Sequence, residues 1–177
     1  MDIIFILLIL GAGILLLVLA AGLFLPATWI IEKAELIAAP TRDIYPLLYN
    51  LREWENWTVW TAEGGALEFE YKGNETGEGA VQEWQSKRIN GTLEITTVVE
   101  NQEIDYVFRI KESNLVVKGT IVLAAADTNY TQVAWRLELE KLAANSPVRR
   151  FQAVFIRNYF ERAIEESLLS LQSMFAK

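Results

Sequence analysis

Few residue types in this chain can carry out acid–base or nucleophilic chemistry. Its 177 residues include neither His nor Cys, which removes Ser–His and Cys–His nucleophile pairs and the commonest ligand of transition metals. Any catalysis would therefore have to use carboxylates, Lys, Arg or Tyr. Glu68 and Glu70 alternate with apolar residues, so we expect both to point into water rather than to form an acid–base pair. We expect no metal ion and no cofactor.

Aromatic residues are the strongest candidates for a binding site. Many of them fall on positions predicted below to face the interior, and ligand pockets are lined mostly by apolar and aromatic side chains. The set comprises Phe69, Tyr71, Trp84, Tyr106, Phe108, Trp135, Phe151, Phe155 and Tyr159. Gln82 and the tyrosine hydroxyls would supply polar contacts to a lipid, quinone or polyketide-like ligand. The alternative is a filled core, because bulky rings dominate ordinary cores as well.

Three tryptophans, Trp54, Trp57 and Trp60, follow one another at intervals of three residues. This spacing places their indole rings on one face of a short helix. They would form a lid or a membrane-facing lip over the mouth of a pocket. Alternatively they pack the helix against the sheet, which is the usual role of an aromatic stripe at helical spacing. We include all three among the candidate ligand-binding residues.

Two cations, Arg149 and Arg150, lie in the first turn of the predicted terminal helix. The helix macrodipole is positive at that end, so a cation there is unfavourable by about 0.3–1 kcal/mol unless an anion is close. An anion such as a lipid phosphate, bound at the helix N-terminus, would explain their position. A surface ion pair with Glu138 or Glu140, both near in sequence, is the simpler explanation.

Many of these candidate residues are predicted to lie on β-strands. Between residues 67 and 139, six segments alternate apolar and polar residues, as strands with one buried face do. Short turn sequences such as Asn90-Gly91 separate them, which predicts an antiparallel meander. The inward positions are Leu67, Phe69 and Tyr71; Ala80, Gln82 and Trp84; Leu93, Ile95, Thr97 and Val99; Ile104, Tyr106, Phe108 and Ile110; Val117, Gly119, Ile121 and Leu123; and Val133, Trp135, Leu137 and Leu139. We predict another strand near residues 30–37 and then a helix capped by Thr41.

Residues 146–175 have the spacing of one long helix with a broad apolar face. Ser146 and Pro147 are typical of a helix start, and apolar residues then recur at steps of three and four. Such a face needs a large apolar surface to lie against, and the predicted sheet is the candidate. The sequence therefore predicts an α+β fold in which a curved antiparallel sheet is wrapped around the C-terminal helix. A ligand would occupy any space left between them.

Residues 3–25 are unbroken apolar sequence. As a helix they are long enough to cross a hydrocarbon core of about 30 Å, so we predict a single-pass membrane anchor over residues 1–28 and a folded domain over residues 29–177. Trp29 would lie at the membrane interface. A cleaved signal peptide is the alternative, but the segment begins without a basic residue and exceeds the usual apolar length of about 7–15 residues. The nearest cations, Lys33 and Arg42, do not decide which side of the membrane the domain faces.

The net charge of −7 argues against a nucleic-acid partner, because binding to phosphates needs a basic face. The partners that we expect instead are the lipid bilayer, through residues 3–25, and a hydrophobic small molecule. Other membrane subunits are a further possibility, with the apolar helix docking on them through Gly11, Gly13 and Gly22.

The domain resembles the polyketide cyclase/dehydrase-like branch of the START/Bet v 1 superfamily, which has the helix-grip fold. The resemblance covers residues 29–177, and each motif is weak alone. The matching residues are Ala39-Pro40, Ile44-Tyr45-Pro46-Leu47-Leu48, Asn50, Trp54, Trp57, Trp60, Tyr71, Gly73, Gly77, Gly79-Ala80, Trp84, Gly119-Thr120, Thr131, Val133, Trp135, Glu165-Glu166-Ser167-Leu168 and Leu171. Many members also share an N-terminal apolar segment ending as Leu23–Pro26 does here. The resemblance implies a cavity for hydrophobic molecules between sheet and helix, but it implies no single chemistry, because the fold hosts carriers, cyclases and protein-binding modules.

Three functions therefore remain open at this point. The first is a membrane-anchored protein that binds or transfers a hydrophobic small molecule. The second is an accessory subunit of a larger membrane complex, with its interior filled. The third is a cyclase or dehydratase, which would need an ionisable group with a shifted pKa inside the pocket. We expect the first, since tyrosines are the ionisable groups at the inward positions.

Overall fold

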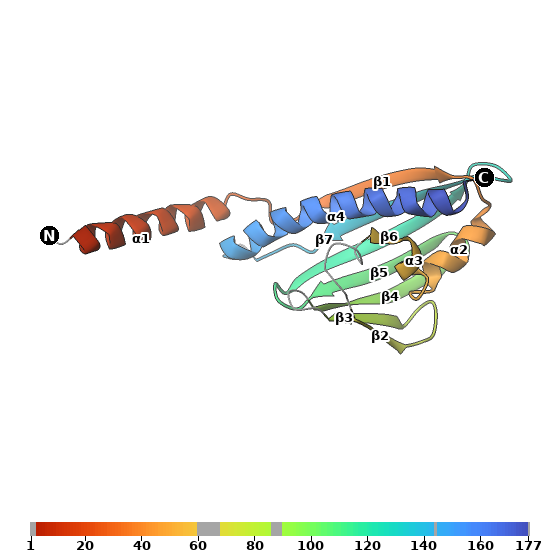
Figure 1. The fold of residues 1–177 in the computed structure, drawn as a ribbon, viewed down its shortest axis with the longest axis horizontal. Helices are drawn as coiled ribbons and strands as arrows, with labels where there is room; N and C mark the ends of the chain where they lie inside the picture. Colours follow the sequence, from red (N-terminus) through yellow and green to blue (C-terminus); the bar gives the residue numbers. More distant parts are fainter. Residues whose placement is uncertain (1–2, 60–67, 86–89, 144, 177) are drawn as a thin grey trace.

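The computed structural model describes residues 3–59, 68–85, 90–143 and 145–176. In chain order its elements are α1 (Ile3–Gly22), β1 (Ile30–Ile37), α2 (Thr41–Tyr49), α3 (Trp54–Trp57), β2 (Glu68–Gly73), β3 (Ala80–Gln85), β4 (Gly91–Val99), β5 (Glu103–Ile110), β6 (Leu115–Ala125), β7 (Thr131–Leu139) and α4 (Pro147–Met174). Figure 1 shows α4 lying along the sheet, while α1 projects from the end of the domain where α4 begins.

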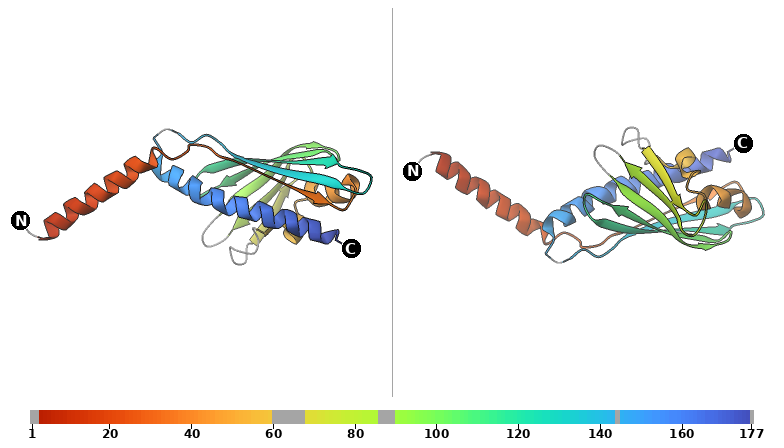
Figure 2. Two further views of the ribbon diagram at one scale, coloured as in Figure 1. Left: turned by 90° about the horizontal axis from the view of Figure 1, so that it is seen from above. Right: turned by 90° about the horizontal axis from the view of Figure 1, so that it is seen from below.

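The seven strands form one antiparallel sheet in the order β1-β7-β6-β5-β4-β3-β2. Strands β2 to β7 make the predicted meander, and β1 reaches across to pair with β7, with Ile31 opposite Leu137. The register of β4 shifts between Ile95 and Thr97, and such bulges bend a strand and increase its twist. The sheet curves around α4, as the two views of Figure 2 show. The predicted α+β helix-grip fold is confirmed.

Two asparagines close hairpins in this meander. Asn101 has φ 57° and Asn114 has φ 50°, in the left-handed region that Asn tolerates better than most residues. They follow β4 and β5, where the sequence predicted turns. The turn chemistry and the strand periodicity therefore agree over most of the sheet. Thr97 and Val99, which were predicted to face inward, are instead exposed, because the bulge in β4 reverses the two faces and Val98 packs against the core.

The starts of α2 and α4 differ in detail from the prediction. Pro40, not Thr41, occupies the N-cap of α2, and Ser146 occupies the N-cap of α4. Among the described residues, neither cap forms a side-chain capping hydrogen bond. Pro147 begins α4 as predicted, because the first helical position leaves its backbone N–H without an intrahelical partner in any case.

Trp29 lies in the core, so its predicted position at the membrane interface is wrong. Its side chain is 7% exposed, its Nε1–H donates to the carbonyl of Ala153 at 3.0 Å, and its ring centroid is 6.1 Å from that of Phe160. A buried indole is stable when its N–H is bonded in this way. Trp29 thus joins the start of β1 to α4.

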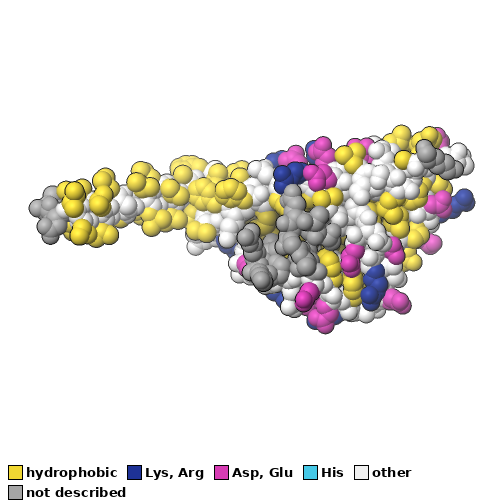
Figure 3. Space-filling view, viewed as in Figure 1, with side chains coloured by type: hydrophobic (Ala, Val, Ile, Leu, Met, Phe, Trp, Pro, Cys, Tyr) yellow, Lys and Arg dark blue, Asp and Glu magenta, His cyan; other side chains and the backbone are white. Residues whose placement is uncertain are grey.

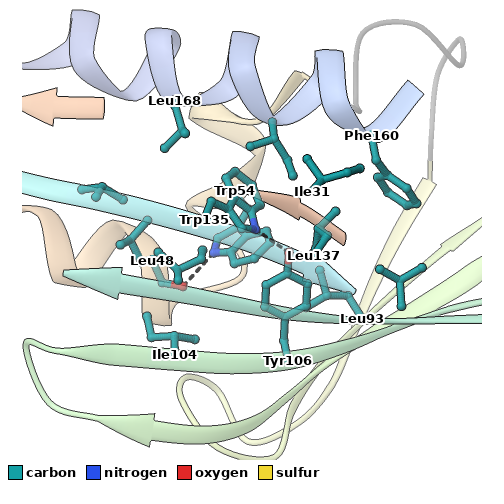
Figure 4. Packing of buried hydrophobic residues seen from close by; sticks show 14 of the residues in the cluster. Ile31, Leu48, Trp54, Leu93, Ile104, Tyr106, Trp135, Leu137, Phe160 and Leu168 are labelled. Atoms are coloured by element: carbon teal, nitrogen blue, oxygen red, sulfur yellow. Dashed lines mark hydrogen bonds between the residues drawn. The ribbon is translucent and has the colours of Figure 1, made fainter. Parts of the chain in front are cut away.

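The centre of the domain is a cluster of large rings (Figure 4). The ring centroid of Trp54 lies 5.2 Å from that of Tyr106 and 5.8 Å from that of Trp135. The ring centroid of Trp57 lies 5.4 Å from that of Trp135. Each indole N–H is bonded: Trp54 to the carbonyl of Leu48, Trp57 to that of Leu47, and Trp135 to the hydroxyl of Tyr106 at 2.7 Å. The cluster therefore buries a large apolar area without leaving these donors unsatisfied.

We predict that Tyr106→Phe destabilises the domain. The substitution removes the acceptor of the buried Trp135 Nε1–H, and leaving a buried donor unsatisfied costs about 1–3 kcal/mol of unfolding free energy. Urea unfolding of the full chain in detergent, followed by tryptophan fluorescence, measures this change.

Tyr130→Phe is the matched control for this substitution, because Tyr130 is 43% exposed. Its unfolding free energy should stay within about 0.5 kcal/mol of the unsubstituted chain. If Tyr106→Phe lowered the unfolding free energy no more than Tyr130→Phe, the hydrogen bond to Trp135 would not stabilise the core.

Candidate functional site

The candidate site residues divide between a closed part and a partly open part of the interior. Trp54, Trp57, Tyr106 and Trp135 belong to the closed part, each at most 1% exposed. For Trp54 and Trp57 the packing alternative therefore holds, and the lip over a pocket mouth is wrong. Trp60 lies outside the described residues.

The partly open part is formed where β2, β3 and β5 face α4. Phe69 of β2, Phe108 of β5 and Tyr159 of α4 pack against the core but are only half-buried. Phe108 stacks on the buried Trp84 with ring centroids 4.4 Å apart and meets Phe160 edge-on at 5.2 Å. In the part of the chain that the structure describes, these side chains thus keep some exposed ring surface beside the core.

A polar group lies beside these rings. Gln82 is 6% exposed, and its Nε2 donates to the hydroxyl of Tyr71 at 3.0 Å. The Tyr71 hydroxyl in turn donates to a carboxylate oxygen of Glu55, and the Arg52 guanidinium lies 4.4 Å from the centre of the Tyr71 ring. The register that places Tyr71 opposite Gln82 brings the two predicted polar residues together.

A pocket of about 230 Å³ opens next to this polar group. Its lining includes Leu51, Arg52, Tyr71 and Ala80. Sites for drug-sized ligands usually measure about 300–1,000 Å³, so this pocket alone is small for such a ligand. It gives solvent access to the side of Tyr71.

Tyr71 and Tyr106 hold their protons firmly. Burial, and then the hydrogen bond to Glu55, raise the pKa of Tyr71 to about 12. Burial also raises the pKa of Tyr106. Neutral tyrosines can donate and accept hydrogen bonds near pH 7, but they are poor general bases, because an effective base has a pKa near the working pH. The geometry thus suits recognition of a polar group better than proton abstraction.

The remaining candidates lie at the start of α4. Phe155 is 76% exposed, so its predicted inward orientation is wrong. Phe151 is half-buried and contacts Gly22 of α1. In the first turns of α4, apolar residues occur on most sides of the helix, so periodicity alone does not identify the buried face.

Arg149 and Arg150 bind main-chain carbonyl groups. Arg149 donates to the carbonyls of Ser113 and Asn114, and Arg150 donates to those of Leu23 and Leu25. Carbonyls that follow the end of α1 carry the negative end of its dipole, which favours a cation there. Sequence reasoning missed these contacts because main-chain acceptors leave no signal in the residue types.

Sequence reasoning also missed the Glu55–Tyr71 bond, because it joins two different elements, α3 and β2.

A family model described as polyketide cyclase / dehydrase and lipid transport matches residues 28–175. The chain belongs to this family. The family assignment agrees with the resemblance seen in the sequence and with the sheet wrapped around α4. A search of curated protein sequences gives no match.

Several solved structures are similar to this member of the family. Protein CV1439 from Chromobacterium violaceum is 15% identical with a TM-score of 0.56, over 83% of this chain and 97% of that one. The Aha1 dimer protein from Colwellia psychrerythraea is 13% identical with a TM-score of 0.57, over 83% and 96%. Protein jhp0584 from Helicobacter pylori is 10% identical with a TM-score of 0.59, over 84% and 88%. At such identities the likeness is one of fold.

We predict that Tyr71 makes stability fall at alkaline pH. Its pKa is about 12 in the folded chain and about 10 when unfolded, so the folded state holds this proton more tightly. The contribution is complete below about pH 10 and is lost as pH rises toward about 12. In Tyr71→Phe the unfolding free energy should fall less over that interval, as urea unfolding at a series of pH values would measure. Identical pH dependence in the two chains would contradict the assignment.

Proposed function

We propose that this protein binds a hydrophobic small molecule between the sheet and α4 and is held at a membrane by α1. The half-buried rings of Phe69, Phe108 and Tyr159 carry the proposal. Phe is among the residue types most often fully buried, so the partial exposure of Phe69 and Phe108 leaves apolar surface that a ligand could cover. A ligand of lipid, quinone or polyketide-like character would complete that cover, and its burial would be favourable at about 25 cal/mol per Å².

The polar group beside the rings suggests how such a ligand is oriented. Tyr71 and Gln82 are already bonded to each other, and Tyr71 is bonded to Glu55. These two hydrogen bonds hold the Tyr71 hydroxyl in place. There it could accept a further hydrogen bond from a ligand, or donate to a ligand in place of Glu55. An apolar body against the rings, with one polar group near Tyr71, is the ligand shape that these residues fit.

The membrane anchor rests on α1. Its 20 residues, Ile3–Gly22, are long and apolar enough to cross a membrane, and the rest of the protein buries none of the most apolar window. At 1.5 Å per residue the helix is about 30 Å long, which matches a hydrocarbon core. A signal sequence has a similar composition, and an intact N-terminus distinguishes the two. The anchor would hold the binding site close to ligands dissolved in the bilayer and raise their effective concentration.

The filled ring cluster favours one other function, an accessory subunit of a membrane complex. Trp54, Trp57 and Trp135 occupy the centre of the interior, which reduces the room for a ligand. Gly11 and Gly13 leave open surface on α1 where another helix could approach. Gly22, in contrast, packs against Pro147 and Phe151 of its own chain, which removes it from the expected docking surface.

Native mass spectrometry of the full chain, purified in mild detergent and followed by organic extraction, tests the proposal. We expect a population carrying a hydrophobic molecule, and a protein mass of 20.1 kDa that shows the N-terminal segment to be retained. Phe69→Ser should reduce occupancy, because removing one ring from a ligand contact costs about 1.5 kcal/mol, or roughly tenfold in affinity.

Val98→Ser is the control variant, since Val98 is also a partly buried apolar residue but lies near Gly77 at the turn between β2 and β3. Its occupancy should equal that of the unsubstituted chain. An empty protein that co-purifies with other chains would contradict ligand binding and support the accessory subunit. A shortened N-terminus would contradict the anchor.

A further inference from the structure

The two halves of α4 are covered to very different extents. In residues 147–159, all of which the structure describes, Ala153 alone is buried. The second half buries an apolar residue on nearly every turn: Phe160, Ala163, Ile164, Leu168 and Leu171. The first half is nevertheless rich in apolar side chains, of which Val148 is 55% exposed and Phe155 is 76% exposed.

The uncovered half of α4 begins where α1 ends. A Cβ added to Gly22 would come within 2.7 Å of the Phe151 ring and 2.8 Å of the Pro147 side chain, so the two helices meet at a distance that only glycine allows. Arg150 of α4 donates to the carbonyls of Leu23 and Leu25. Close packing and these hydrogen bonds together hold the first turn of α4 against the end of α1.

The exposed apolar residues lie on one face of α4. Val148 and Phe155 are seven residues apart, which is almost two full turns, so their side chains point in the same direction. Tyr159, one turn further along, continues this face to the partly open part of the interior. Leu23 and Phe24 add exposed apolar side chains at the junction, at 46% and 90%. Figure 3 shows the apolar surface of α1 running up to this end of the domain.

We propose that the first half of α4 docks on the bilayer surface through Val148 and Phe155, beside the point where α1 enters. This inference rests on the proposed anchoring by α1. A helix with an uncovered apolar face that must begin at the membrane surface gains by burying that face at the interface. Docking would turn the face that leads to Tyr159 toward the lipid, which gives a hydrophobic ligand a short route to the interior.

Single spin labels on the full chain test this docking. The sequence contains no Cys, so Phe155→Cys, Leu169→Cys and Leu10→Cys each carry one nitroxide label. Leu169 is the matched control: it is 47% exposed and lies 14 residues, or about 21 Å, further along nearly the same face of α4. Leu10, 57% exposed on α1, reports separately whether α1 enters the bilayer.

In liposomes of phosphatidylcholine and phosphatidylglycerol, electron paramagnetic resonance compares relaxation by oxygen, which enters lipid, with relaxation by a water-soluble nickel chelate. We expect oxygen to dominate at positions 10 and 155 and the chelate to dominate at 169. Lipid exposure at 10 with water exposure at 155 would overturn the docking and leave the anchor standing. A label at 155 shielded from both agents would also overturn it, since protein would then cover this face. Water exposure at 10 would overturn both proposals.

Discussion

The structure depends on covering the concave apolar face of a single sheet with one long helix. Seven strands about 4.8 Å apart make a sheet about 29 Å wide, whereas a helix with its side chains is about 10–12 Å across. Curvature reduces this mismatch but does not remove it. The protein closes one part of the face with α2, α3 and the second half of α4. Phe69, Phe108 and Tyr159 are less completely buried than the rings in that part, in the described residues, and this is where we propose that a ligand binds.

Large aromatic rings fill the closed part of the interior, and two of them lie over glycines of the neighbouring strand. Tyr106 lies over Gly119 and Trp84 lies over Gly91, since a Cβ added to either glycine would come within 2.1 Å of the ring above it. Each glycine thus makes room for an aromatic side chain on the neighbouring strand. Trp84 in turn stacks on Phe108, so the closed core packs directly against the candidate site. Ser167, fully buried in α4, accepts a bond from the backbone of Val59 and donates to Ala163, which fixes the segment after α3 against the helix.

Local sequence patterns predicted the elements well, and non-local contacts defined the site. Strands β2 to β7 and helix α4 follow from periodicity and turn residues, because each signal lies within a few neighbouring residues. The pairing of β1 with β7 depends on residues about one hundred positions apart, and it carries Trp29 into the core. Periodicity misplaced Phe155, since Phe151, Val154, Phe155 and Ile156 surround α4 with apolar side chains. The bonds of Tyr71 to Glu55 and of Arg150 to the backbone after α1 join distant segments and were likewise beyond local patterns.

Photocrosslinking measures directly whether a ligand contacts Phe108. The full chain would carry p-benzoylphenylalanine at position 108 and be irradiated in native membranes before mass analysis. Position 104 on the same face of β5, fully buried in the described core, would serve as the reference. If a ligand binds between the sheet and α4, we expect an adduct with a hydrophobic small molecule at 108 and crosslinks to protein at 104. Crosslinks to protein alone at both positions would show that the interior is filled and that no ligand contacts Phe108.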